Sequence, residues 1–211
     1  MYLGVTTTGY SVSFFTPTIL SQLGWTAIRA QILSIPIYIV GTSTCLITAF
    51  LTDRLRHRYA FAMLGVVISS IGYIILLAQH SAPVNVRYFS VYLIVAGGYI
   101  TQPITLVWLS NNMGGHYKRS INAAMQVGFG NVGGIIASNI YITDQKPTYP
   151  VGYGVSLGLM WVSGLACTVL FIGMRLENKK REQGKRDHRL TLPKEERENL
   201  GDDHPAFRFV Y

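Results

Sequence analysis

Charged residues are absent from six long stretches of this chain. Each stretch can hold the roughly 20 apolar residues that carry an α-helix across a bilayer core. The stretches are 1–28, 30–52, 59–86, 88–117, 120–143 and 147–174. The pattern therefore predicts six membrane-spanning helices, at Leu3–Leu20, Ala30–Leu51, Ala60–Ala78, Tyr88–Leu109, Ser120–Tyr141 and Tyr153–Met174.

The composition agrees with an all-α membrane protein. Charged residues make up 13% of the chain, whereas soluble domains average about 25%. Residues 175–211 contain ten basic and eight acidic residues, so they differ sharply from residues 1–174. We therefore expect a six-helix transmembrane domain at 1–174 and a charged tail at 175–211, disordered or loosely packed beyond its first turns.

The basic residues predict the orientation. Fifteen of the eighteen Lys and Arg residues lie in the connections after the second and fourth helices or in the tail. Positive charge gathers on the cytoplasmic side of a membrane protein, so this pattern places both termini in the cytoplasm. It also accounts for the net charge of +8 without a nucleic-acid partner.

Polar and aromatic residues recur inside three of the predicted spans. Amide groups are costly in lipid, so they should face other helices or a water-filled cavity. A hydrogen bond between helices accounts for any single one of these polar residues. Their recurrence in stripes on three helices favours a shared aqueous pathway. The candidate substrate-binding residues are Tyr10, Phe14, Gln102, Thr105, Asn122, Gln126 and Asn131.

Other chemistries find little support. Gly128–Gly133 matches the glycine pattern of dinucleotide-binding loops, but it lies inside an uncharged span, where glycines favour close helix packing. Cys45 and Cys167 also fall inside spans, which argues against a disulfide or a metal site. The sequence contains no recognisable catalytic set, so we expect neither an enzyme nor a bound metal or cofactor.

The segment Asp53–Arg58 resembles the loop between helices of the major facilitator superfamily. That loop has the form G-x-x-x-D-R-x-G-R-R/K, and this chain has Ala49 and Arg56 at the two glycine positions, as in the weaker second-half copy. The resemblance implies a cytoplasmic gate formed by Asp53, Arg54 and Arg58. The alternative is a topology-determining basic loop with one incidental acid.

Further segments resemble the fungal allantoate-permease-like anion:cation symporters of that superfamily. They are Tyr10–Ile19, Trp108–Asn112, Gly115–Arg119, Gly130–Ile136, Tyr141–Tyr149 and Gly201–Phe209. The resemblance covers only the second half of the family fold. It implies proton-coupled transport of a small organic anion, a carboxylate such as allantoate, nicotinate or pantothenate, across the plasma membrane.

The resemblance also implies a missing N-terminal six-helix half. The first span begins directly after Met1, and none of the predicted spans contains Lys or Arg. We therefore expect a fragment whose partner half supplies the charge that binds the anion. The alternatives are a truncated inactive gene product, an independent six-helix oligomeric membrane protein and a membrane enzyme.

Overall fold

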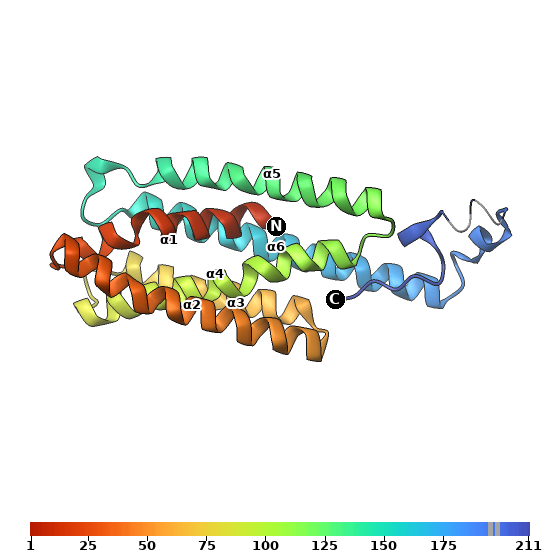
Figure 1. Cartoon of the computed structure of the whole chain (residues 1–211), viewed down its shortest axis with the longest axis horizontal. Helices are drawn as coiled ribbons and strands as arrows, with labels where there is room; N and C mark the ends of the chain where they lie inside the picture. The colour runs from red at the N-terminus through yellow and green to blue at the C-terminus, as the bar shows by residue number, and fades with distance from the viewer. Residues whose placement is uncertain (194–195, 197–198) are drawn as a thin grey trace.

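The computed structural model describes residues 1–193, 196 and 199–211, so residues 194–195 and 197–198 of the predicted tail lie outside the described part. Six long helices confirm the all-α prediction (Figure 1). They are α1 Tyr2–Gln22, α2 Ala27–Leu55, α3 Arg58–Leu77, α4 Val84–Asn111, α5 His116–Ile140 and α6 Pro150–Glu182. Short 3-10 turns follow at Thr143–Gln145, Asp187–Thr191 and Gly201–Asp203.

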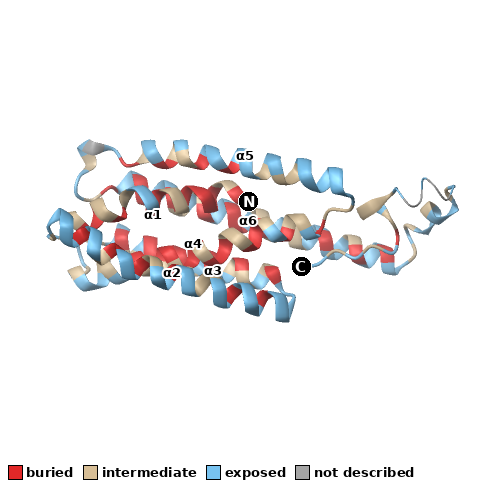
Figure 2. Cartoon of the chain, viewed as in Figure 1, coloured by how far each residue is buried: buried red, intermediate tan, exposed pale blue. Residues whose placement is uncertain are grey.

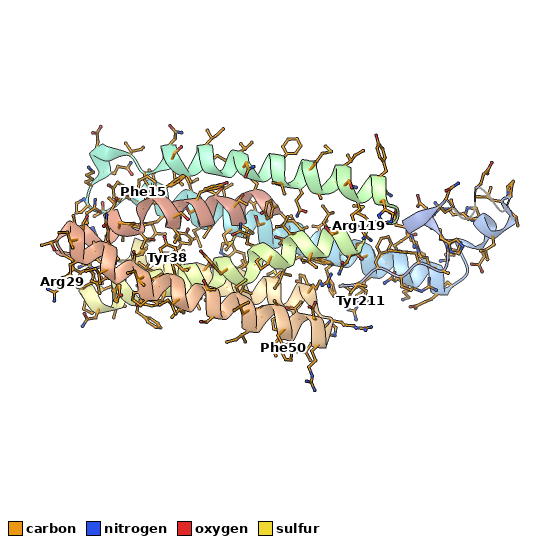
Figure 3. The ribbon with its side chains drawn as sticks, viewed as in Figure 1. Phe15, Arg29, Tyr38, Phe50, Arg119 and Tyr211 are labelled. Carbon is orange, nitrogen blue, oxygen red and sulfur yellow. The ribbon has the colours of Figure 1, made fainter. Side chains whose placement is uncertain are left out.

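The helices run up and down, and their connections gather at two ends (Figure 1). The α1–α2, α3–α4 and α5–α6 connections form one end, here called the loop end. The α2–α3 and α4–α5 connections and the tail form the other, here called the tail end. Arg29 and Arg119, labelled in Figure 3, lie at the loop end and the tail end respectively.

Close helix contacts depend on glycine. The most extensive contact joins α3 to α4, and α1 packs on α2, α4, α5 and α6. A Cβ added to Gly133 would meet Thr6 and Thr7 at 2.8 Å, so α5 approaches α1 closely there. A Cβ on Gly130 would approach the Tyr2 ring even more closely, and the Thr6 hydroxyl donates to the Gly130 carbonyl at 2.7 Å. Gly130 and Gly133 therefore serve helix packing, as the sequence predicts, whereas a Cβ on Gly128 would meet no atom within 4 Å, so the prediction is wrong there.

The surface is apolar in the way a membrane protein requires. Among the described residues, α2, α3, α4 and α6 are long and apolar enough to cross a bilayer. Large side chains such as Ile39 and Phe50 of α2 are 60% and 68% exposed. Helices α1 and α5 are not among these four, because they carry many of the polar residues, and α5 is exposed along most of its length (Figure 2).

All six helices extend beyond the predicted spans at one end or both, and α6 extends furthest. Helix α4 begins at Val84 behind an extended Pro83, and this places Arg87 in its first turn. Helix α6 continues through Arg175 to Glu182, so the predicted boundary between residues 174 and 175 falls inside one continuous helix. Charged residues such as Arg175 mark the end of the membrane-embedded part of a helix. The helix itself continues, because its further turns lie in water.

The last residues of the tail are docked, which differs from the loose packing expected from the sequence. The Trp108 indole donates to the Val210 carbonyl at 2.8 Å, and the Asn112 amide pairs with the Val210 backbone in both directions at 2.8 and 2.9 Å. Asn178 makes the same two-way pair with Phe209, at 2.9 Å in each direction. The segment Gly201–Tyr211, here called the docked tail, therefore bridges α4 and α6.

Ionic contacts add a second set of attachments. Lys118 of α5 lies 2.7 Å from both carboxylate oxygens of Asp202. Beyond the predicted span, Arg186, which lies after the end of α6, donates to the two carboxylate oxygens of Glu177 on α6 at 2.8 and 2.9 Å. These hydrogen bonds lower the pKa of Glu177 to about 2.

The lowered pKa of Glu177 predicts that the stability of the fold depends on pH in the acid range. A carboxylate whose folded pKa lies below its unfolded value, about 4.3, stabilises the fold above that value and loses this effect as the pH falls through about 2. We expect Glu177→Gln to lower the thermal unfolding temperature in detergent by a few degrees at pH 6, with the difference closing toward pH 2. Glu182→Gln, at an exposed residue of the same helix, should change little at any pH; a constant offset for Glu177→Gln would contradict the prediction.

Candidate functional site

The first candidate site is a pocket of about 240 Å³ halfway along the bundle, here called the middle pocket. It lies between α1 and α4 and is lined by Thr6, Gly9, Tyr10, Ser13, Tyr99 and Gln102. Two of the predicted site residues, Tyr10 and Gln102, therefore share one cavity. None of the six lining residues carries a charge, so the pocket offers hydroxyl and amide groups on an aromatic wall.

Tyr10 organises the edge of the middle pocket. Its hydroxyl donates to the Asn131 amide oxygen of α5 at 3.0 Å, and its ring stacks on Phe14 with centroids 5.8 Å apart. Phe14 is 52% exposed, so one side of this aromatic pair faces away from the bundle. The structure thus places Tyr10, Phe14 and Asn131 together, on one surface shared by α1 and α5.

A second pocket, of about 300 Å³, lies next to it toward the tail end and is here called the tail-end pocket. It is lined by Met1, Tyr2, Leu3, Leu109, Asn122, Met125, Gln126, Phe129 and Gly130. Thr6 lines the middle pocket and Tyr2, one turn earlier on α1, lines this one. The two pockets therefore follow each other along α1.

Gln126 has unused hydrogen-bonding capacity in the tail-end pocket. Its amide nitrogen donates to the Thr105 backbone carbonyl at 3.1 Å, while its amide oxygen is buried without a partner among the described residues. Among the described residues, the Asn122 amide nitrogen bonds to the Met113 sulfur alone, at 3.2 Å. A buried amide oxygen without a donor is costly, so a ligand that donates a hydrogen bond would be stabilised there.

Thr105 differs from the other predicted site residues. Its side chain is fully buried, and its hydroxyl donates to the Gln102 carbonyl of its own helix at 2.9 Å. It therefore supports α4 and leaves ligand contact to Gln102. Three lining residues, Thr6, Ser13 and Tyr99, were not predicted from the sequence. Ser13 and Tyr99 lie three residues from Tyr10 and Gln102, so helical spacing places them on the same helix faces.

The predicted gate is centred on Arg58. Its guanidinium lies 3.8 Å from Asp53, donates to the Val107 carbonyl at 3.3 Å, and donates to Asn111 when that amide turns its oxygen inward. Arg58 therefore ties the α2–α3 turn to the end of α4. Arg54 is exposed and makes no ion pair with a described residue.

The backbone conformation of Arg56 explains why the related motif has glycine at this position. It ends α2 with φ of 55° and ψ of 22°, the left-handed region that favours glycine. The motif has glycine at this position. The turn geometry is therefore the one that the motif requires, even though the residue differs.

The unequal burial of Arg58 and Asp53 predicts that their substitutions lower the stability of the fold by different amounts. Arg58 has a side chain only 10% exposed, whereas Asp53 is 78% exposed. Arg58→Ala removes the hydrogen bonds to the Val107 carbonyl and the Asn111 amide that tie the α2–α3 turn to α4, so we expect it to lower the free energy of unfolding by about 1–3 kcal/mol. Asp53→Asn should cost about 1 kcal/mol or less, as exposed ion pairs do. Thermal unfolding in detergent measures both, with Arg54→Ala as the control, and equal losses for all three would contradict the assignment.

Comparison with known proteins shows which proteins this chain is similar to. No family model matches the chain. It is 35% identical to the MFS-type transporter cnsO of Penicillium expansum over 95% of its own length and 40% of that protein. It is 31% identical to the high-affinity nicotinic acid transporter of Saccharomyces cerevisiae over 99% of its length and 39% of that protein. The major facilitator-type transporter hxnP of Emericella nidulans is 28% identical over 86% of the chain.

The chain spans about two fifths of the length of these relatives. The matched part is their C-terminal half, as the resemblance at Tyr10–Ile19 and Asp53–Arg58 implies. Six helices and apolar outer surfaces agree with an integral membrane protein. The chain therefore belongs to the major facilitator superfamily and corresponds to the C-terminal part of its fungal transporters.

Proposed function

We propose that this chain is the C-terminal half of a twelve-helix carrier that imports a small organic anion together with protons. The observation that carries the proposal is the middle pocket, an uncharged polar cavity between α1 and α4. Transporters of this kind bind substrate near the bilayer midplane, between two halves. The pocket lies halfway along both helices, which supports the same location here.

The pocket chemistry favours a small planar carboxylate. The rings of Tyr10 and Tyr99 line the pocket as an aromatic wall, Phe14 stacks on Tyr10 from outside it, and the Gln102 amide offers a hydrogen-bond donor. A volume of about 240 Å³ suits a single-ring acid. One relative is named for nicotinic acid, which is a planar single-ring carboxylate. Allantoate and pantothenate are acyclic carboxylates and remain further candidates for the carrier, although the aromatic wall favours the ring acid. Transport rather than catalysis is the activity that these groups support.

The charges of the substrate and of the coupled proton require groups from elsewhere. The lining residues of the middle pocket include no Lys, Arg, Asp or Glu. A carboxylate in a water-poor site needs a cation or a helix N-terminus. We therefore propose that the N-terminal half supplies both the cation and the proton-carrying acid.

We further propose that the tail end faces the cytoplasm and that the protein resides in the plasma membrane. The basic residues of the α2–α3 and α4–α5 connections and of the tail support this orientation. The tail-end pocket then lies on the inner side of the middle pocket, where Asn122 and Gln126 line the exit. Arg58, Asp53 and Arg54 border the same face, as a gate requires.

Uptake of radiolabelled carboxylates tests the proposal. The chain is expressed alone and together with an N-terminal six-helix half from a related transporter, with membrane insertion confirmed in both cases. Uptake of nicotinate, allantoate or pantothenate only when both halves are present, with dependence on the proton gradient, is the expected result. Uptake by the chain alone would favour a self-assembling six-helix carrier, and none in either case would favour an inactive gene product.

A further inference from the structure

A third pocket, of about 160 Å³, lies at the loop end and is separate from the other two. It is here called the loop-end pocket. Its polar lining residues are Gln22 of α1, Gln79 and His80 after α3, Arg87 of α4, and Thr148 before α6. Leu76 and Tyr153, each 2% exposed, lie at its inner side. It shares no residue with the middle or the tail-end pocket.

Arg87 brings an uncompensated charge to this pocket. It forms no ion pair with any described residue, and its Nε atom is buried without a hydrogen-bond partner in the described structure. A guanidinium keeps its charge at all accessible pH values. Arg87 as a whole is half-buried, and its Nε–H is removed from water without a partner, so a ligand that supplies negative charge would be stabilised there.

Gln22 gives the pocket a second polar group. Its amide nitrogen lies 3.0 Å from the Tyr149 hydroxyl, and its amide oxygen is buried without a partner among the described residues. A tyrosine hydroxyl both donates and accepts. Turning the Gln22 amide by 180° therefore keeps the bond to Tyr149 and frees an N–H donor for the pocket. Gln79, by contrast, is held by the Thr148 carbonyl at 2.7 Å.

We propose that the loop-end pocket binds one small oxyanion, a carboxylate or a phosphate group, through the guanidinium of Arg87 and the amide of Gln22. A planar guanidinium matches two oxygens of such a group at once. The volume admits a compact free anion or the phosphate of a lipid headgroup, and it excludes an acyl chain. The bound anion links the loop ends of α1 and α4. This inference does not depend on the transport proposal, since it concerns binding to the chain itself.

Thermal unfolding of the purified chain tests the site. The protein is held in lipid-free maltoside and a sulfonate buffer, and acetate or inorganic phosphate is titrated at constant ionic strength. The unfolding temperature of the wild type should rise by several degrees and saturate, because a ligand that binds only the folded state stabilises it. Arg29→Gln, which removes an exposed arginine at the same end of the bundle (Figure 3), should rise equally. Arg87→Gln should show no saturable rise, and an unchanged rise in that variant would overturn the proposal.

Chemical labelling of the wild type provides a measurement that does not require the variant to fold. 2,3-Butanedione modifies accessible arginines, and mass spectrometry reports the rate at each residue. Free acetate or phosphate should slow the labelling of Arg87 at least fivefold while leaving Arg29 unchanged. If only phosphatidylglycerol protects Arg87, and phosphatidylcholine and the free anions do not, the anion is a lipid headgroup and the site stands. Equal labelling rates for Arg87 under all these conditions would overturn it.

Discussion

Gly97→Val is expected to prevent the normal packing of α3 against α4. A Cβ on Gly97 would overlap the Ser69 hydroxyl and the backbone carbonyl of Gly65, and a backbone atom cannot move aside as a flexible side chain can. Ser69 is itself held by the Ile94 carbonyl at 3.1 Å. Overpacking costs about 1–3 kcal/mol and occasionally more, and the backbone contacts at Gly97 place it at the upper end, a large share of the roughly 5–15 kcal/mol that stabilises a typical domain.

The same substitution at Gly158 provides a matched control. A Cβ at Gly158 of α6 meets no atom within 4 Å, so valine there should be nearly neutral. Folded yield after detergent extraction and thermal unfolding of the purified protein compare the two variants. If Gly97→Val and Gly158→Val lose equal stability, the close approach of α3 and α4 is not what limits substitution at Gly97.

The sequence predicted these helices because charge is costly in lipid. Six uncharged stretches correspond to six helices, and the only large differences lie at helix ends. Arg87 shows why. A long basic side chain reaches toward the membrane surface from inside a helix, so a single arginine between two uncharged stretches does not mark where α4 begins.

The docked tail was not predictable in the same way. Its attachments are backbone carbonyls that accept from Trp108, Asn112 and Asn178, three residues on two distant helices. Such contacts leave no periodic pattern in the tail itself. Its high charge indicates disorder when it is considered alone, and the partners that hold it are polar side chains at the ends of α4, α5 and α6.

The candidate site was predicted only in part, because helical spacing relates residues on one helix but not residues on different helices. Helical spacing placed Tyr10 beside Phe14, but it could not show that Gln102 and Gln126 line different cavities. That division depends on how far α4 and α5 are shifted along α1, and the Thr6–Gly130 contact sets the position of α5. Polar residues within one helix are therefore more readily grouped from sequence than polar residues on different helices.

The two cavities predict that substitutions in each of them cause different transport defects once the chain is assembled with an N-terminal half. If the substrate carboxylate accepts a hydrogen bond from Gln102 in the middle pocket, Gln102→Leu should raise KM for uptake by about 10- to 150-fold, the value of one hydrogen bond to a charged group. Gln126→Leu should abolish uptake, because it removes a polar group from the exit and also the bond that holds α5 to Thr105.

Asn139→Leu is the matched control for both substitutions. Asn139 is an exposed amide near the loop end of α5, and its nitrogen bonds only to the Ile135 carbonyl and to Ser138 of its own helix. Uptake by this variant should equal that of the wild type at equal surface expression. Normal uptake by Gln126→Leu would remove the tail-end pocket from the pathway, whereas a Gln102→Leu defect confined to the maximal rate would move substrate binding out of the middle pocket. The two outcomes are independent, because the two glutamines line pockets that share no residue.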